Sequence, residues 1–165
     1  MKKSDVDYLY EWATRTDFPL RRAPTAVGYS NKDIYFCWLK AQNDNGGGVR
    51  YSVVQDERAK SILESNEVLV ASVAFFESGT ELGPHKDPPV YGMKYRRIQV
   101  PLYIPCSKCC YMIWKGKKVS WKEGEPQIYD VMDHVHEGYN HSDGDMIFLF
   151  VDIEKRDDNS NLQEV

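Results

Sequence analysis

The larger, C-terminal part of the chain alternates short apolar segments with turn-forming residues, and this pattern restricts the fold most. Seven strand-like segments follow residue 67, separated by clusters of Gly, Pro, Asn or Asp. They span residues 68–76, 95–104, 110–114, 118–121, 127–130, 135–139 and 146–153. Short strands at close, regular intervals are typical of β-sandwiches and barrels, whereas βαβ units need a helix between strands. We therefore predict a mainly β fold.

The residues before this region are predicted to form helices as well as strands. Residues 4–15 carry apolar side chains at helical spacing, which predicts a helix with Ser4 and Asp7 as a capping pair. A second, shorter helix is predicted over residues 57–65. Two strand-like segments and a glycine-rich turn are predicted between these helices: residues 33–40, 50–54 and 43–48.

The length of the chain indicates one domain, and its net charge is small. The 165 residues favour a single domain over 1–154, with helical support from 4–66 and a catalytic β core over 67–154. The polar residues 155–165 are expected to form a disordered tail. With 21 basic and 25 acidic residues the net charge is −4, so no nucleic-acid partner is expected.

The sequence shows no secretory or membrane-spanning segment. Its N-terminus lacks an apolar signal core, and no window approaches the roughly 18 apolar residues of a membrane span. We therefore expect a soluble, cytoplasmic protein whose four cysteines are reduced thiols. The Cys106-x-x-Cys109 pattern is half of a zinc site, but without a second such pair we favour core or hairpin thiols.

The segment Gly83-Pro84-His85-Lys86-Asp87-Pro88-Pro89 carries the chemistry. On an extended chain, His85 and Asp87 point to the same side and can converge on one ion. A second imidazole must come from elsewhere, and residues 133–137 offer both His134 and His136. Two imidazoles and one carboxylate on one face of an octahedron leave positions open for dioxygen and a co-substrate, as in non-haem Fe(II) oxygenases. The alternative is that His85 is a turn residue and Asp87 a cap.

The stretch from Phe75 to Asp152 resembles the aspartyl/asparaginyl β-hydroxylase family. The resemblance rests on motifs in family order and spacing: Ser78-Gly79-Thr80, Pro84-His85, Leu102-Tyr103-Ile104-Pro105, Trp121-Lys122-Glu123-Gly124, His136-Glu137-Gly138-Tyr139-Asn140 and Phe148-Leu149-Phe150-Val151-Asp152. It implies a double-stranded β-helix, the cupin-like jelly roll, here preceded by one or two helices. It also implies a dioxygenase that uses Fe(II), O2 and 2-oxoglutarate to hydroxylate an unactivated C–H bond.

The resemblance selects the second histidine. Counting back from Asp152, His136 falls on the family's distal metal ligand without a gap, so the implied ligand set is His85, Asp87 and His136. His134 is then expected to be structural or to support the site. The best-known animal members of the family lack a carboxylate at the position of Asp87. Its presence here makes the triad complete.

A second departure concerns the co-substrate. Met146, ten residues after His136, occupies the position of a family arginine that pairs with a 2-oxoglutarate carboxylate. Because an unpaired carboxylate in a dry pocket is costly, another cation is needed. Arg97 aligns with a second family arginine that contacts the co-substrate, and Gln99 shares its strand parity. These two residues are therefore predicted to bind 2-oxoglutarate, while Arg96 points the other way.

Two other functions stay open at this level. Met146 motivates a cupin-type metalloenzyme that does not use 2-oxoglutarate, and a β-barrel interaction module with structural histidines is the non-enzymatic alternative. The substrate of the hydroxylase is expected to be a small molecule or a peptide. The sequence does not predict an oligomeric state.

Overall fold

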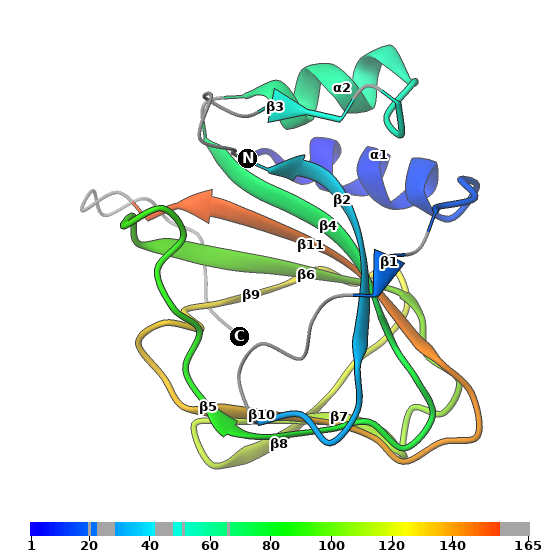
Figure 1. Cartoon of the computed structure of the whole chain (residues 1–165), viewed down its shortest axis with the longest axis vertical. Coiled ribbons are helices and arrows are strands. Elements are labelled where there is room, and N and C mark those ends of the chain that lie inside the picture. Colours follow the sequence, from blue (N-terminus) through cyan, green and yellow to red (C-terminus); the bar gives the residue numbers. More distant parts are fainter. Residues whose placement is uncertain (20, 23–28, 42–47, 51, 66, 156–165) are drawn as a thin grey trace.

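Two antiparallel sheets face each other and enclose the centre of the molecule (Figure 1). The computed structural model describes residues 1–19, 21–22, 29–41, 48–50, 52–65 and 67–155. The larger sheet has the strand order β1-β2-β4-β11-β6-β9, with β3 beside β2, and the smaller has the order β5-β10-β7-β8. Their bounds are β1 Arg21–Arg22, β2 Ile34–Ala41, β3 Gly48–Val49, β4 Val68–Phe76, β5 Glu81–His85, β6 Tyr95–Tyr103, β7 Cys110–Trp114, β8 Lys117–Ser120, β9 Gln127–Tyr129, β10 His136–Asn140 and β11 Met146–Glu154.

Two helices cover the outer face of the larger sheet, so the fold is layered as helices, large sheet and small sheet (Figure 1). Helix α1 (Lys3–Ala13) buries its apolar stripe there, and α2 (Glu57–Glu64) begins where the Asp56 carboxylate accepts a 2.7 Å hydrogen bond from the backbone N–H of Ala59. The prediction of a mainly β jelly roll with N-terminal helices is confirmed. No described helix combines the length and hydrophobicity needed to cross a membrane.

The larger sheet separates two hydrophobic cores, and strand parity decides which residues reach each core. On β11, Leu149, Val151 and Ile153 pack toward the helices, whereas Met146 and Phe148 lie in the core between the sheets. On β6 the apolar parity also faces the helices and comprises Ile98, Val100 and Leu102. The polar parity of β6, which carries Arg97 and Gln99, is thereby directed into the space between the sheets.

Three local predictions are wrong. The first turn of α1 has no side-chain cap, and Asp7 pairs instead with Lys3 Nζ at 2.7 Å. The described residues of the predicted strand over 50–54, which are 50 and 52–54, do not form a strand. The backbone N–H groups of Val53 and Val54 both donate to the Arg50 carbonyl oxygen at 2.9 Å, forming a turn that brings Val54 into the core beneath the helices.

The third wrong prediction concerns the cysteines, because Cys106 and Cys109 form a disulfide with a Cα–Cα distance of 5.2 Å. The expectation that all four thiols are reduced is therefore wrong for this pair, which a tight turn before β7 brings together. Cys37 and Cys110 are buried cysteines on different sheets and lie outside this disulfide, so the described residues offer no four-cysteine zinc site. The predicted turn over 43–48 falls mostly outside the described residues, as does the tail from 156 onward.

Candidate metal centre

The two histidines of the predicted triad are direct cross-strand partners. In the antiparallel pairing of β5 with β10, His136 lies opposite His85. Directly opposed residues hold their Cβ atoms about 4.5–5.5 Å apart on one face of a sheet, so both imidazoles project together into the interior. The next pair is Gly138 with Leu82, which leaves one extra residue on β5. This bulge re-aims His85 at the end of its strand.

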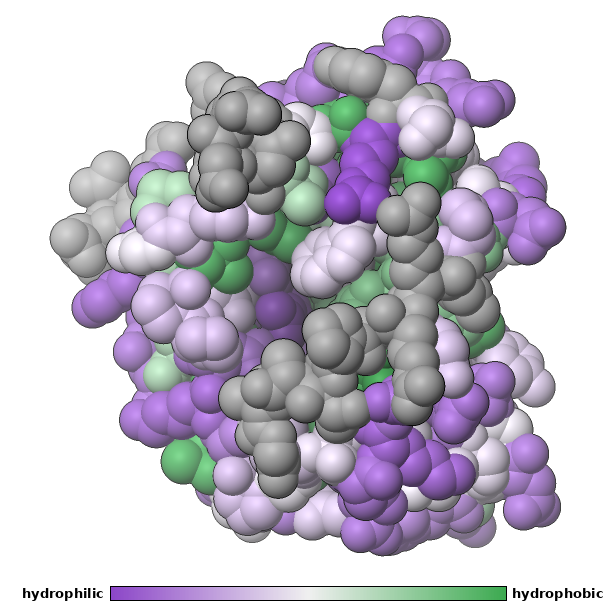
Figure 2. Space-filling view, viewed as in Figure 1, coloured by the Kyte–Doolittle hydropathy of each residue, from purple (hydrophilic) through white to green (hydrophobic). Residues whose placement is uncertain are grey.

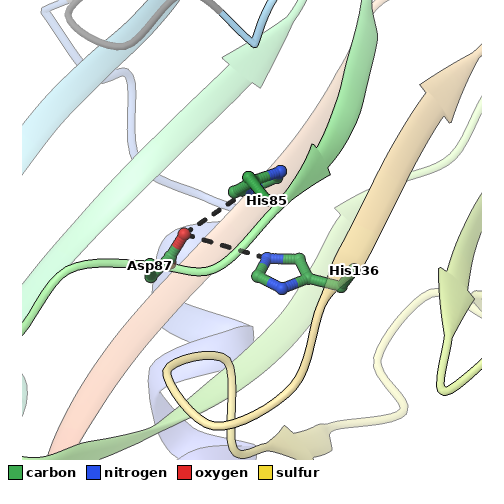
Figure 3. Close-up of side chains that lie close together, drawn as sticks. All are labelled: His85, Asp87 and His136. Carbon is green, nitrogen blue, oxygen red and sulfur yellow. Dashed lines mark ion pairs between the residues drawn. The ribbon is translucent and has the colours of Figure 1, made fainter.

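Asp87 completes the cluster from the segment that follows β5 (Figure 3). Its backbone N–H donates to the Val131 carbonyl oxygen at 3.1 Å, which ties the segment to the loop before β10. Asp87 Oδ1 lies 3.4 Å from His85 Nε2 and 3.8 Å from His136 Nε2. One donor atom from each residue lies within 4.8 Å of the others, close enough for one ion to contact all three.

Hydrogen bonds to backbone carbonyls fix the orientation of both imidazoles. His85 Nδ1 lies 2.7 Å from the Gly83 carbonyl oxygen, and His136 Nδ1 lies 3.2 Å from that of His134. A carbonyl oxygen can only accept, so each Nδ1 carries the proton and each Nε2 keeps its lone pair for a metal. Tyr29 stacks on the His85 ring with centroids 3.9 Å apart and planes 6° apart, which restricts rotation of that ring.

The electrostatics favour the protonation states that a metal ion needs. Burial lowers the pKa of His136, so this imidazole is neutral at neutral pH. Burial alone would raise the pKa of Asp87, but Arg97 and the two histidines outweigh it and hold that pKa below its usual range. A neutral His136 and an ionised Asp87 are therefore presented beside the His85 imidazole. Such a set suits a divalent transition metal, and with open coordination positions it is the ligand set of non-haem Fe(II) oxygenases.

Arg97 lies beside the triad between two carboxylates. Its Nε and Nη2 donate to the two oxygens of Asp152 at 2.7 and 2.8 Å, and its Nη1 donates to Asp87 Oδ2. Tyr95 Oη lies 3.3 Å from both Arg97 Nη2 and Asp87 Oδ2. Burial disfavours the guanidinium charge, but the two carboxylates outweigh burial and raise the pKa of Arg97. The triad thus joins a buried ionic network anchored on the opposite sheet.

A cavity of about 420 Å³ opens beside the triad, a size typical of small-molecule sites. The face of the molecule drawn in Figure 2 also shows a hollow. The walls of the cavity are mainly apolar and aromatic side chains from both sheets, among them Phe36, Phe76, Met112, Met146, Phe148 and Phe150. Three buried polar atoms in its lining residues have no hydrogen-bond partner among the described residues: Thr80 Oγ1, Gln99 Oε1 and Trp121 Nε1.

The remaining histidines and Arg96 lie outside the cluster. The His134 carbonyl orients His136, while the exposed His141 ring bonds Glu81 Oε1 at 2.9 Å. Arg96 donates to the buried Asp130 at 3.0 Å rather than to a surface carboxylate. Sequence reasoning missed Tyr29 and Asp152 as members of the site. Asp152 had one usable signal, because it is the acidic residue that interrupts an apolar run from Met146 to Ile153, on the interior parity of the strand.

Known structures share the architecture. A 2OG-Fe(II) oxygenase family oxidoreductase from Burkholderia pseudomallei matches with a TM-score of 0.64 and 10% identity, over 90% of this chain and 79% of that one. A predicted oxalate decarboxylase from Thermotoga maritima matches at 0.51 and 15% identity, over 84% and 95%. A cupin 2 conserved barrel domain protein from Rhodopseudomonas palustris matches at 0.51 and 10%, over 85% and 74%. At these identities the likeness shows the fold alone.

Sequence comparison assigns the family. No curated protein matches the chain significantly. The family profile described as aspartyl/asparaginyl beta-hydroxylase matches residues 49–156, which is more than half of the chain and contains the whole triad. This match begins at residue 49, whereas the resemblance based on motifs begins at Phe75, so the match also includes α2. Profile and fold agree, and the chain belongs to the aspartyl/asparaginyl β-hydroxylase family.

Proposed function

We propose that this protein is an Fe(II)-dependent oxygenase that uses O2 and a 2-oxo acid to hydroxylate a C–H bond. The observation that carries the proposal is the geometry of His85, Asp87 and His136, whose donor atoms lie within 4.8 Å of one another. Family membership supports hydroxylation as the reaction class. 2-Oxoglutarate is the co-substrate that the resemblance implies, and a small molecule or a peptide is the proposed substrate.

The residues present fit an iron ion. Both Nδ1 atoms are occupied by carbonyl oxygens, so the two Nε2 atoms and one oxygen of Asp87 would hold the metal. Bound Fe(II) would supply the redox chemistry that activates O2. The chain's own residues hold and orient that ion, and the apolar cavity walls exclude water from it. Arg97, beside Asp87, is the described cation closest to the triad that a co-substrate carboxylate could meet.

Metal stoichiometry and coupled turnover test the proposal. Protein purified without chelator and loaded anaerobically with Fe(II) should bind one ion per chain and consume O2 only when a 2-oxo acid is added. His85→Ala and His136→Ala should each lose the ion and the O2 consumption. His141→Ala is the matched control, because His141 is exposed and bonds only outside the triad. Full metal occupancy and turnover in both triad variants would rule out the proposed site.

A metalloenzyme of this fold that uses no 2-oxo acid is the second candidate. Two observations favour it: Met146 is buried in the cavity wall at the position of the family arginine, and Arg97 already pairs with two carboxylates. In this case the ion would act on its substrate directly. Calorimetry on the anaerobic Mn(II) form separates the candidates, because the absence of heat with any 2-oxo acid at millimolar concentration supports the second one.

A further inference from the structure

We propose that the cavity beside the triad selects a 2-oxo acid with a single carboxylate and a neutral, mainly apolar side chain, rather than a dicarboxylate. This inference rests on the proposed function and specifies its co-substrate. Three features of the cavity support it: the charges that face it, the residues along its wall and the buried polar atoms without a described partner.

The charge balance of the site favours a monoanion. Asp87 and Asp152 each contribute one negative charge and Arg97 one positive charge, so these three buried groups sum to −1. A divalent ion brings the sum to +1, and a singly charged ligand then makes the site neutral. A dicarboxylate would leave an excess negative charge in a pocket of low polarity, which is costly.

The described side chains that line the cavity include one cation, which is Arg97. Its Nε, Nη1 and Nη2 all donate to Asp152 or Asp87, and Nη2 also reaches Tyr95 Oη. One ligand carboxylate near the metal can share this guanidinium. A second one would need another cation at the far end of the cavity.

The far end of the cavity is apolar instead. Asp152 pairs with Arg97 in the sheet, and the same face of β11 continues through Phe150 and Phe148 to Met146. At about 3.4 Å per residue, Met146 lies roughly 20 Å along the strand from Asp152. The Met146 side chain is only 3% exposed, and a thioether offers a carboxylate nothing comparable to an arginine. This wall suits a hydrocarbon or aromatic side chain.

Three neutral hydrogen-bonding side chains also line the cavity and restrict what ligand it can hold. Thr80, Gln99 and Trp121 are at most 6% exposed, and each lines the cavity with a buried polar atom that has no described partner. Such buried groups are rare unless a bound molecule or water satisfies them. Trp121 Nε1–H can only donate, and Gln99 Oε1 can only accept, so together they suit a bound water or another neutral group rather than a second carboxylate. The Trp121 ring also packs on Phe148, with centroids 4.8 Å apart, next to the apolar wall.

The affinities of several 2-oxo acids for the Mn(II) form of the protein, measured without O2, test the inference. Isothermal calorimetry would compare 2-oxoglutarate with phenylpyruvate and 4-methyl-2-oxopentanoate. We expect at least one of the two neutral-side-chain acids to bind at least tenfold more tightly than 2-oxoglutarate. Met146→Arg should reverse this order by restoring a cation, whereas Met146→Leu, which keeps the wall apolar, should leave it unchanged.

The outcomes separate this inference from the proposed function. If Mn(II) binds at one ion per chain but 2-oxoglutarate binds as tightly as both neutral acids, or no 2-oxo acid binds, the selectivity is refuted while the metal centre stands. If the protein binds no metal, the proposed function and the inference both fail. The order of affinities in the unsubstituted protein needs no variant, so the test holds even if Met146→Arg does not fold.

Discussion

Arg97 is predicted to stabilise the fold more than either of the carboxylates that it contacts. It lies between Asp152 and Asp87, so removing it leaves two buried negative charges without their shared cation. Removing Asp152 leaves Arg97 paired with Asp87, and the remaining pair is neutral. We therefore compare Arg97→Met with Asp152→Asn, two substitutions that keep most of the side-chain volume.

The magnitudes follow from burial. The side chains of Arg97, Asp87 and Asp152 are 19%, 9% and 4% exposed, so solvent screens them weakly. Breaking a buried ion pair by removing one partner costs about 3–5 kcal/mol, and we expect this cost for Arg97→Met. Asp152→Asn keeps one acceptor and loses charge-assisted hydrogen bonds worth about 1.5–3 kcal/mol. The difference between the variants should be on the order of 2 kcal/mol.

Urea unfolding at neutral pH measures both costs as shifts of the midpoint at unchanged slope. The metal-free protein is compared first, and the titration is then repeated with saturating Mn(II). The added cation compensates Asp87, so the cost of Arg97→Met should shrink on metal binding. Arg96→Met is the matched control, because its partner Asp130 keeps Lys155 at 3.1 Å; we expect a cost of about 1 kcal/mol. A metal-free Asp152→Asn variant that is no more stable than Arg97→Met would refute the reasoning.

Packing, capping and metal binding each permit a further measurement. Leu149→Ala, at a fully buried position between the larger sheet and the helices, should lower the free energy of unfolding by about 2–5 kcal/mol, against almost no change for the exposed Lys117→Ala. Asp56→Ala should cost about 1 kcal/mol in urea titrations, whereas Asp56→Asn keeps the cap of α2. The Ala59 N–H holds the pKa of Asp56 below its usual range. The charge of Asp56 therefore contributes to the free energy of unfolding above about pH 4, and this contribution is lost as the pH falls through the lowered pKa. The Asp56→Asn variant should not show that loss. Mn(II) at a hundred times its dissociation constant should stabilise the protein by about 2.7 kcal/mol in thermal or urea unfolding, and His136→Ala should abolish this gain.

Each of these expectations has a contrary result. Equal stabilities of the Leu149→Ala and Lys117→Ala variants would mean that the helices do not seal the core against the larger sheet. An Asp56→Asn variant as unstable as Asp56→Ala would remove the capping argument. A stabilisation by Mn(II) that persists in His136→Ala would place the ion elsewhere on the chain.

Local patterns in the sequence indicated most of the strands and one pair of candidate metal ligands. Short apolar segments between turn residues predicted the strands from β4 to β11 apart from β5, although the same pattern failed at residues 50–54. That strand, at the edge of the smaller sheet, contains Gly83 and Pro84, which mask its extended character in the sequence. The His85-x-Asp87 spacing indicated a metal ligand pair because side-chain direction along an extended chain depends only on neighbouring residues.

Only the tertiary structure decided how these parts meet. The register that sets His136 opposite His85 joins strands fifty residues apart, and it brings the side chains that the family resemblance implied as ligands close together. The pairing of Arg97 with Asp152 depends in the same way on the register between β6 and β11. A strand sequence specifies which of its residues share a face, but hydrogen bonding between distant strands determines which face opposes which. For that reason the candidate ligands could be predicted from the sequence and the family resemblance, whereas the ion pairs of the neighbouring Arg97 could not.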